Sequence, residues 1–418
     1  MKKFFLILPA SIILISCTTP RNLERHPSSN PMDPSSTQVC PFDTKDPQWK
    51  SHLLIHHFYV GQGNSAFIRT PSGTTVLIDA GLQGQGTATI LLVLKACGFY
   101  GVDYAVLTHP HVDHFGGYED LFKAGFKVNV AFYLPSYVDS IGPNSIGDWL
   151  GFKLIADGGV TSEGTSIPGY LGSLGAKHSR IPLLDNKQIV DRAVDPNQRV
   201  DFNIVAADAH VQNGTPTGAQ VRSAFSDPDS EKPTPKDNNA LSISMMISYQ
   251  KFSYFIGGDL TGGGEGKKKD KPDVESEVAK VVHQIDVYHA DHHGSDTSNN
   301  AAILTALKPT SVIVSVGLGG SNGDNSKQSP QGYHLPDYAA ILRMIQVGQV
   351  SQIFMTSRGE TMTQDYKTAI NVATDPVTSS HVVDMNGSVT LLSDGQTYEI
   401  SGETTKPGEY KFNARGNK

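Results

Sequence analysis

Residues 107–117 read Leu-Thr-His-Pro-His-Val-Asp-His-Phe-Gly-Gly, and this stretch decides how the rest of the chain is interpreted. It gathers the imidazoles of His109, His111 and His114 and the carboxylate of Asp113. Such groups are unfavourable to bury without cations, and imidazole with carboxylate suits zinc or a similar divalent ion. The proline after His109 disfavours a regular helix, so we expect the side chains to converge from a loop. The alternative is a solvated histidine-rich loop.

Three further segments end in residues of the same chemical kind. One expected strand ends in Leu-Ile-Asp79-Ala-Gly, a later strand ends in Gly-Gly-Asp259, and a third is followed by Asp-His292-His293-Gly-Ser. Chemistry placed at strand ends in a β-β-β-α-β order indicates a layered sheet covered by helices.

Short runs of β-branched and aromatic residues between turn residues predict the individual strands. The expected strands are 53–60, 65–69, 75–79, 104–108, 241–249, 252–259, 285–289 and 311–316, with a helix at 89–98 and a hairpin made of 388–393 and 397–401. Residues 206–239 and the glycine-lysine run 262–271 are rich in loop formers, and we interpret both as surface loops or insertions. The lysine run is either a solvated face or a binding patch.

Taken together, these segments resemble the signature of the metallo-β-lactamase superfamily, which consists of hydrolases with an αββα sandwich. The resemblance implies an α+β four-layer αββα sandwich with loop insertions. It also implies that His109 and His111 hold one metal ion and that Asp113 and His114 hold another. Asp259 would bridge the two ions, which would be zinc or manganese.

The resemblance implies further roles for residues outside the first cluster. His292 or His293 would complete the ligand set. Asp79 would orient the histidine loop through hydrogen bonds. His334 would face the substrate as a donor or acid, or else be structural. With Asp113, these last two residues form the expected catalytic set.

One ligand expected from the superfamily has no obvious counterpart in the sequence. Many members carry a histidine between the first cluster and the bridging aspartate. His178 and His210 lie in that interval, but neither follows a clear strand, so we interpret both as surface or loop residues. One metal ion would then have an incomplete protein shell.

A narrower resemblance covers residues 52–401. The run Val-Gly-Gln-Gly-Asn-Ser at 60–65, the His-His-Gly-Ser run and Gly-Tyr-His-Leu-Pro at 332–336 are similar to the extracellular domain of ComEC competence proteins. Phosphorylcholine esterases share part of this pattern. Asn64 departs from it, because the competence-type motif usually has aspartate there. The ComEC membrane channel has no counterpart, so the chain resembles a free-standing relative.

The first residues predict export. Residues 1–16 combine a basic start with an apolar stretch, and Leu-Ile-Ser-Cys17 resembles a lipoprotein lipobox with Cys17 as the acylated residue. The alternative is an ordinary secretory signal. Residues 17–50 predict a flexible tether, 51–402 the hydrolase domain and 403–418 a C-terminal tail. We therefore expect a lipid-anchored protein of the cell envelope, on the periplasmic side of the outer membrane.

Cysteine usage and charge add two constraints. Outside the cytoplasm Cys40 and Cys97 can pair, but their separation in sequence leaves the pairing open. A formal net charge of −7 provides no global field that would attract nucleic acid, so an anionic substrate would have to be held locally, by metal.

These observations predict an exported hydrolase that uses a hydroxide activated by two metal ions, with phosphodiesters as substrates by the competence-type resemblance. The first alternative is a hydrolase of small esters, lactams or phosphorylcholine-bearing envelope polymers. The second is an inactive envelope binding protein, against which the intact motifs argue. The sequence leaves the oligomeric state open.

Overall fold

The computed structural model describes thirteen segments of the chain: 40–42, 47–135, 158–160, 166–168, 177–179, 184–231, 233–264, 270–317, 334–357, 360–362, 369–402, 405 and 408–416. The expected signal peptide at 1–16, Cys17 and most of the expected tether lie outside these segments. No helix in the described segments is long and apolar enough to cross a membrane.

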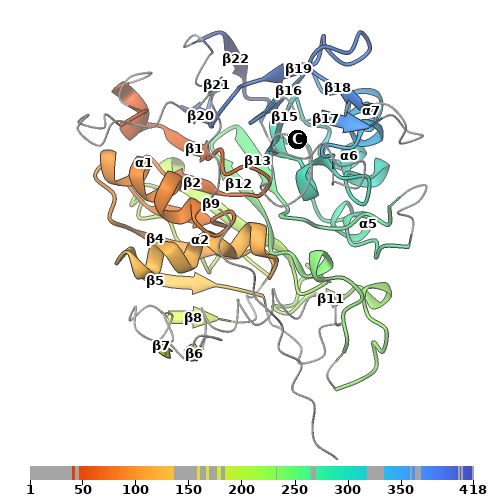
Figure 1. The fold of residues 1–418 in the computed structure, drawn as a ribbon, viewed down its shortest axis with the longest axis horizontal. Helices are drawn as coiled ribbons and strands as arrows, with labels where there is room; N and C mark the ends of the chain where they lie inside the picture. Colours follow the sequence, from red (N-terminus) through yellow and green to blue (C-terminus); the bar gives the residue numbers. More distant parts are fainter. Residues whose placement is uncertain are drawn as a thin grey trace, which may run out of the picture. The chain divides into compact units, whose positions relative to one another are not determined.

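The described residues form two large mixed sheets (Figure 1). In the first sheet the spatial order is β22 (Tyr410–Asn413), β21 (Thr397–Gly402), β20 (Val389–Ser393), β1 (Leu53–His57), β2 (Ala66–Arg69), β3 (Thr75–Ile78), β4 (Gly101–Val106), β5 (Lys127–Tyr133) and β8 (Lys177–Ser179). Strands β3, β4, β5 and β8 are parallel and the other neighbours are antiparallel.

In the second sheet the spatial order is β11 (Ala219–Gln220), β10 (His210–Val211), β9 (Val200–Ala207), β12 (Ser244–Tyr249), β13 (Phe252–Ile256), β14 (Val287–His289), β15 (Ser311–Val314), β16 (Gln352–Met355) and β19 (Val382–Asp384). Strands β13 to β16 and β19 run parallel. Two small hairpins pair β6 (Gly158–Val160) with β7 (Ser166–Pro168) and β17 (Glu360–Met362) with β18 (Ala369–Asn371).

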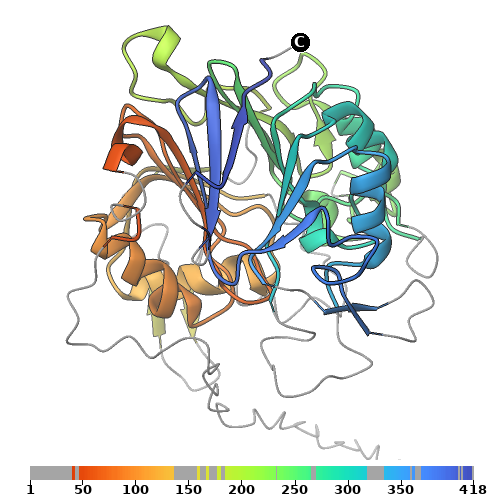
Figure 2. The ribbon, with the colours of Figure 1, turned by 90° about the horizontal axis from the view of Figure 1, so that it is seen from above.

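Helices cover the outer faces of both sheets. The described α-helices are α1 (Leu91–Ala96), α2 (Val112–Lys123), α5 (Glu275–Val278), α6 (Ala301–Leu307) and α7 (Tyr338–Gln346). Shorter helical turns are η1 (Pro47–Ser51), η2 (Gly86–Ile90), η4 (Pro196–Gln198), η5 (Arg222–Ala224), η6 (Asn238–Leu241) and η8 (Asp291–Gly294). In Figure 2 the orange helices lie outside the first sheet and the teal and blue helices lie outside the second.

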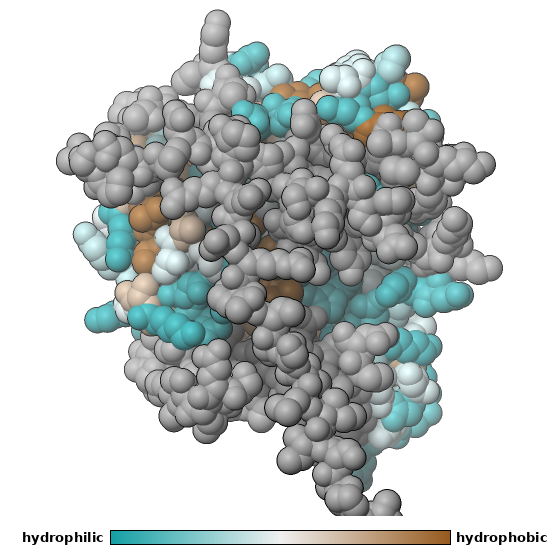
Figure 3. Space-filling view, in the orientation of Figure 1, coloured by the Kyte–Doolittle hydropathy of each residue, from teal (hydrophilic) through white to brown (hydrophobic). Residues whose placement is uncertain are grey.

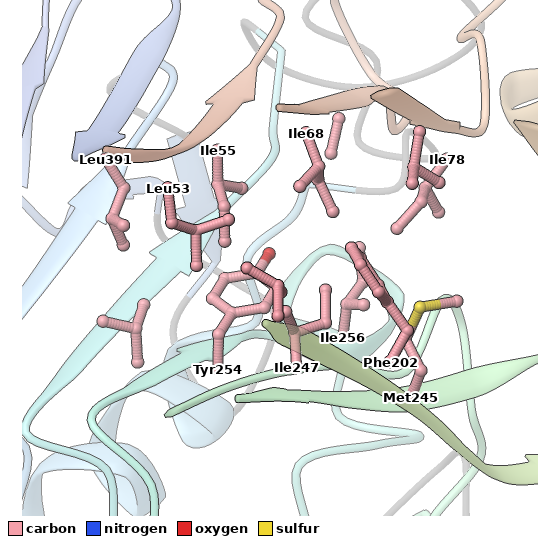
Figure 4. Close-up of a cluster of buried hydrophobic side chains, with 14 of the residues drawn as sticks. Leu53, Ile55, Ile68, Ile78, Phe202, Met245, Ile247, Tyr254, Ile256 and Leu391 are labelled. Atoms are coloured by element: carbon pink, nitrogen blue, oxygen red, sulfur yellow. The ribbon is translucent and has the colours of Figure 1, made fainter. Parts of the chain in front are cut away.

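Three apolar cores correspond to the three interfaces of this arrangement. The middle core lies between the sheets, where Ile55, Ile68 and Leu391 face Tyr254 and Ile256 (Figure 4). A second core joins α1 and α2 to the first sheet, and a third joins α6 and α7 to the second. The expected four-layer αββα sandwich is therefore confirmed.

On the face drawn in Figure 3, the described residues are mostly hydrophilic or neutral, and hydrophobic atoms occur in small groups. The large exposed hydrophobic side chains are scattered over several elements: Leu92, Tyr100, Val112, Val130, Val190, Val194, Val281, Val347 and Val377. Single exposed apolar residues are normal for a protein surface.

Three expectations for local structure need correction. The histidine cluster is not only a loop, because α2 begins at Val112. The interval 206–239 contains the β10–β11 hairpin as well as short helical turns. The interval 403–418, expected as a tail, contains β22, which pairs with β21, and Phe412 of that strand stacks on Tyr398.

Candidate metal centre

The predicted ligands come together near the ends of three strands. His109 lies three residues beyond β4, Asp259 three residues beyond β13, and His293 follows β14. Ends of parallel strands gather at one edge of a sheet, and α/β proteins commonly place their sites there. The structure thus joins segments separated by up to 184 residues, from His109 to His293, in one cluster.

The loop after β4 is fixed by Asp79. The backbone N–H of Thr108 donates to Asp79 Oδ1 at 2.8 Å, and its hydroxyl donates to Asp79 Oδ2 at 2.8 Å. Asp79 itself has a φ of +58°, a conformation that aspartate tolerates better than most residues. The strand β4 therefore ends against a buried carboxylate, which sets the direction in which His109 leaves the sheet.

Asp113 and His114 lie in the first turn of helix α2, contrary to the expected loop. His111 occupies the position before the helix with an extended backbone, so Pro110 lies outside the helix and does not disturb it. Gly117 lets this helix pack closely, because a Cβ there would lie 2.0 Å from the carbonyl oxygen of Ala80. An acidic residue at a helix start is also favourable to the helix dipole.

Asp259 reaches the cluster because β13 ends in glycines. Gly258 has a φ of +65°, and a Cβ there would lie 2.7 Å from the Cβ of Thr108. The Asp259 N–H donates to the hydroxyl of Ser242 at 3.1 Å. A larger residue at position 258 would clash with Thr108, so this glycine lets the Asp259 segment approach the histidine loop closely.

His292 and His293 occupy consecutive left-handed backbone positions, with φ values of +50° and +53°. Non-glycine residues rarely adopt this conformation, and two in succession are costly. The turn directs His293 to Asp113, with Nε2 3.3 Å from Oδ2, and His292 to Asp259, with Nε2 3.6 Å from Oδ2. Costly backbone of this kind is typical of functional sites.

Two groups of donor atoms result, and they share Asp259. The first contains His109, His111 and Asp259, and the second contains Asp113, His114, Asp259 and His293. Asp259 divides its oxygens between them. Its Oδ2 lies 3.7 Å from His109 Nε2, and its Oδ1 lies 3.2 Å from His114 Nε2 and 3.6 Å from His293 Nε2.

The donor spacing fits divalent metal ions. Ligand atoms around one tetrahedral zinc lie about 3.3 Å apart, because each bond is about 2.0–2.1 Å long. The corresponding separations are 3.0 Å between His109 Nε2 and His111 Nδ1, and 3.3 Å between His293 Nε2 and Asp113 Oδ2. Within the described part of the chain, the buried Nε2 atoms of His114 and His293 make no hydrogen bond. These are the atoms that metal ions would engage.

The charges of the cluster also call for a cation. Burial opposes a charge on His114, but the carboxylates of Asp259, Asp79 and Asp113 outweigh it and hold the pKa of His114 well above its usual value. Burial likewise opposes the charge on Asp259, yet His114 and His293 hold the pKa of Asp259 well below its usual value. Positive charge at this cluster is thus stabilised by the buried carboxylates, and a divalent metal ion would supply such charge.

Hydrogen bonds at the second ring nitrogen orient three of the histidines. His114 Nδ1 lies 2.8 Å from Asp79 Oδ2, His293 Nδ1 lies 2.9 Å from the carbonyl oxygen of Ser315, and His292 Nδ1 lies 2.7 Å from Thr297 Oγ1. For His293 the carbonyl can only accept, so Nδ1 carries the proton and Nε2 is free to bind metal. The contact of Asp79 with His114 is one through which the predicted orienting role could act.

The two alternatives for the last ligand occupy different positions. His293 joins Asp113 and His114 in the second group. His292 faces the same oxygen of Asp259 as His109 does, and it lies on the side of the first group. The position of His292 therefore suits the place that the missing histidine would fill.

The remaining predicted histidines lie elsewhere or are only partly described. His210 is on β10, where its Nδ1 is 2.9 Å from the carbonyl oxygen of Asp208, and it belongs to neither donor group. His178 pairs with Phe132 through the backbone of β8, but its side chain lies outside the description. His334 is partly buried in a segment that packs on the metal loop, where a Cβ at Gly294 would lie 2.7 Å from Pro336.

Sequence reasoning missed the residues that hold the ligands in place. Thr108, Ser242, Thr297 and Ser315 carry no motif of their own, and their roles depend on pairings between distant strands. In the sequence Asn64 stands out only as a departure from the competence-type motif, yet its amide donates to Asp79 Oδ2 at 3.0 Å. The one available signal was position, because Thr108 and Thr297 flank the histidine motifs.

The layered fold and the two donor groups are those expected for a metal centre of the metallo-β-lactamase fold. Residues 58–140 match the model of the metallo-beta-lactamase superfamily. The matched segment includes Asp79 and the histidine cluster. No curated protein sequence gives a match.

Solved structures with similar architecture include several metalloproteins. CmlA, a diiron β-hydroxylase from Streptomyces venezuelae, is 13% identical with a TM-score of 0.38, over 71% of this chain and 51% of that one. A diphosphatase of the PhnP family is 13% identical with a TM-score of 0.30, over 61% and 73%. Zinc-bound PqqB from Methylobacterium extorquens is 11% identical with a TM-score of 0.30, over 61% and 77%. The chain thus spans about half the length of CmlA.

Proposed function

We propose that this protein is an exported hydrolase that cleaves phosphodiesters with the help of two divalent metal ions, zinc or manganese. The observation that carries the proposal is the position of Asp259, whose two oxygens face two separate donor groups. A carboxylate placed in this way suits a pair of ions rather than one ion. Paired sites of this kind suit displacement at phosphorus, where an attacking and a leaving oxygen both need stabilisation.

Different residues would bind each of the two ions, and others would orient those ligands. His109, His111 and His292 would hold one ion, and Asp113, His114 and His293 the other. Bound ions would supply an activated water and neutralise charge on the phosphoryl group in the transition state. Asp79 keeps His114 in one orientation, and Ser315 does the same for His293.

The burial of the ligands indicates the side from which substrate enters. The side chains of His114 and His293 are 0% and 2% exposed, whereas those of Asp113 and His292 are 25% and 20% exposed. His111 is also partly exposed. Substrate would therefore approach across His111, Asp113 and His292, and the buried ligands would form the closed side.

The preference for phosphodiesters rests on the competence-type motifs around Gln62, His293 and His334, together with the paired donor groups. The net charge of −7 gives no general attraction for nucleic acid, so the anionic group would be held at the metal centre. A lactam or ester carbonyl requires one activated water and one polarising ion, and so makes less use of a pair.

Side-by-side rates would test this preference. The mature protein, with and without chelator, would be given bis(p-nitrophenyl) phosphate, plasmid DNA, a chromogenic cephalosporin and a homoserine lactone. We expect the phosphodiesters to be cleaved faster, and only without chelator. Faster turnover of the cephalosporin would replace the proposal with lactam hydrolysis. No turnover of any substrate by the metal-loaded protein would favour a binding protein.

We also propose that the protein is anchored in the cell envelope by acylation of Cys17. Cys40 and Cys97 form a disulfide in the structure, which suits an oxidising compartment outside the cytoplasm. Several acyl chains would give firm attachment to the membrane. Cys17→Ala should release the protein without changing its catalytic rate. A wild-type protein found entirely soluble, with no lipid by mass spectrometry, would refute the anchor.

A further inference from the structure

The middle core changes from apolar to polar side chains where it meets the metal centre. Along β1 and β14 the inward-facing residues are apolar until the last position, which His57 and His289 occupy, and Ser315 directly follows β15. All three are buried, with at most 1% of their surface exposed. Figure 4 shows the apolar part of this layer, with Ile55 of β1 opposite Tyr254 of β13. The floor of the metal centre is thus polar although the core around it is not.

The two histidines stack on each other across the two sheets. Their ring centroids are 4.7 Å apart and their planes differ by 8°. Burial lowers the pKa of His57 to about 3 and holds the pKa of His289 well below its usual value. Both rings are therefore neutral at physiological pH and stack without charge repulsion.

Hydrogen bonds at each end of the stack fix its position. The Tyr254 hydroxyl and His57 Nε2 form a hydrogen bond of 2.9 Å. His289 Nε2 lies 2.9 Å from Ser315 Oγ. The carbonyl oxygen of the same serine accepts the hydrogen bond from Nδ1 of His293, at 2.9 Å. A continuous series of contacts therefore joins Tyr254 to a metal ligand.

Stability alone does not account for this pair. Within the described residues, neither His57 Nδ1 nor His289 Nδ1 has a hydrogen-bond partner, and a buried polar atom without a partner costs free energy. Two aromatic hydrocarbon side chains would fill the same space without that cost. The hydrogen bonds to Tyr254 and Ser315 are the contacts that such side chains could not make.

We propose that His57 and His289 are positioning residues of the metal centre, which hold Ser315 so that its carbonyl fixes the tautomer and direction of His293. The proposal rests on the metal-dependent function proposed above. It assigns a role to residues outside both donor groups. Partners of metal ligands commonly affect metal affinity by about 10–100-fold.

The test measures zinc affinity rather than activity. Dissociation constants for both zinc ions would be obtained by competition with a chromophoric chelator, for the mature wild-type protein, His289→Phe, Ser315→Ala and the double variant. We expect each single variant to bind one of the two zinc ions, the one held through His293, about tenfold less tightly. The double variant should lose little more, because both changes interrupt the same series of contacts.

His56→Phe is the matched control. His56 is also a buried histidine of β1, but it faces the outer side, where it is 2.9 Å from Thr390 Oγ1. This variant should lose stability and keep wild-type zinc affinity. If His289→Phe fails to fold, Tyr254→Phe removes a single hydroxyl and should weaken zinc binding in the same direction.

Two results would overturn the inference, and they are distinguishable. The first result is wild-type zinc affinity in both His289→Phe and Ser315→Ala, or in Tyr254→Phe if His289→Phe does not fold. It would show that His57 and His289 only pack the core, and it would leave the proposed function unchanged. A wild-type protein that binds no zinc would overturn the proposed function as well.

Discussion

Asp79→Asn is the substitution whose effect follows most directly from the structure. Asp79 is fully buried and accepts four hydrogen bonds. Its Oδ2 accepts from the Thr108 hydroxyl, Asn64 Nδ2 and His114 Nδ1, at 2.8 to 3.0 Å, and its Oδ1 accepts from the Thr108 N–H. Asparagine has the same shape but one acceptor oxygen.

The size of the effect can be worked out from these four bonds. In its better orientation the asparagine oxygen takes the three donors of Oδ2, and its amide then faces the Thr108 N–H, donor against donor. One charge-assisted bond is lost, worth about 1.5–3 kcal/mol, and the negative charge next to His114 disappears. We expect a loss of about 3 kcal/mol in the free energy of unfolding and of about 10–100-fold in metal affinity.

The assay combines urea unfolding with zinc competition. Asp191→Asn is the control, because Asp191 is also a buried carboxylate and accepts from Thr70, Ser72 and the N–H of Val200, none of which belongs to the metal centre. The control should lose comparable stability with unchanged zinc affinity. Asp79→Asn with wild-type zinc affinity, or an equal loss of affinity in the control, would refute the reasoning.

Three other predictions concern the ligands, pH and the disulfide. Asp259→Ala should reduce turnover to the level of the chelator-treated protein, whereas His178→Ala should change turnover little. If elemental analysis found one metal site empty in His178→Ala, His178 would be the missing ligand. Burial lowers the pKa of His57 to about 3 in the folded protein, whereas the ordinary pKa of histidine is about 6.5. Below about pH 6.5 the unfolded chain therefore binds a proton that the folded protein does not bind, so the free energy of unfolding falls as the pH falls. In urea melts, His57 should account for a loss of ~2 kcal/mol in the free energy of unfolding between pH 7 and 5. If the free energy of unfolding of His57→Phe depended on pH as steeply as that of the wild type, this prediction would be contradicted. Replacing Cys40 and Cys97 by serine should cost about 4 kcal/mol by loop entropy, given a separation of 57 residues; an unchanged melting temperature would argue against the disulfide.

The fold could be predicted because its signals are local. Apolar alternation marks the strands around Ile55 and Ile68, and turn residues separate them. The helix α2 was missed for a physical reason. Pro110 and the glycine pair argue against helix by propensity, but the proline lies before the first turn and Gly117 is required by close packing against Ala80.

The ligands could be predicted because metal-binding residues have a distinctive composition, but their arrangement could not. The choice between His292 and His293 depends on two consecutive residues with left-handed backbone conformation, and the residue types at these positions do not predict that conformation. The pairing of Cys40 with Cys97 likewise requires the Cα atoms to approach to 4.6 Å, which sequence separation does not reveal. Contacts between strands distant in sequence decide both.

The same limit applies to the residues behind the ligands. Ser315 lies 22 positions from His293, and His57 lies 232 positions from His289. Only the pairing of β14 with β15 and the packing of the two sheets bring them together.

The number of metal ions bound by the mature protein tests the central claim most directly. Wild-type protein and Asp259→Asn would be saturated with zinc, freed of excess by gel filtration and analysed for metal per chain. Because Asp259 offers one oxygen to each donor group, we predict two ions per chain for the wild type and fewer than two for the variant, with catalytic rate following occupancy. Full activity in wild-type protein that retains no metal would contradict the account.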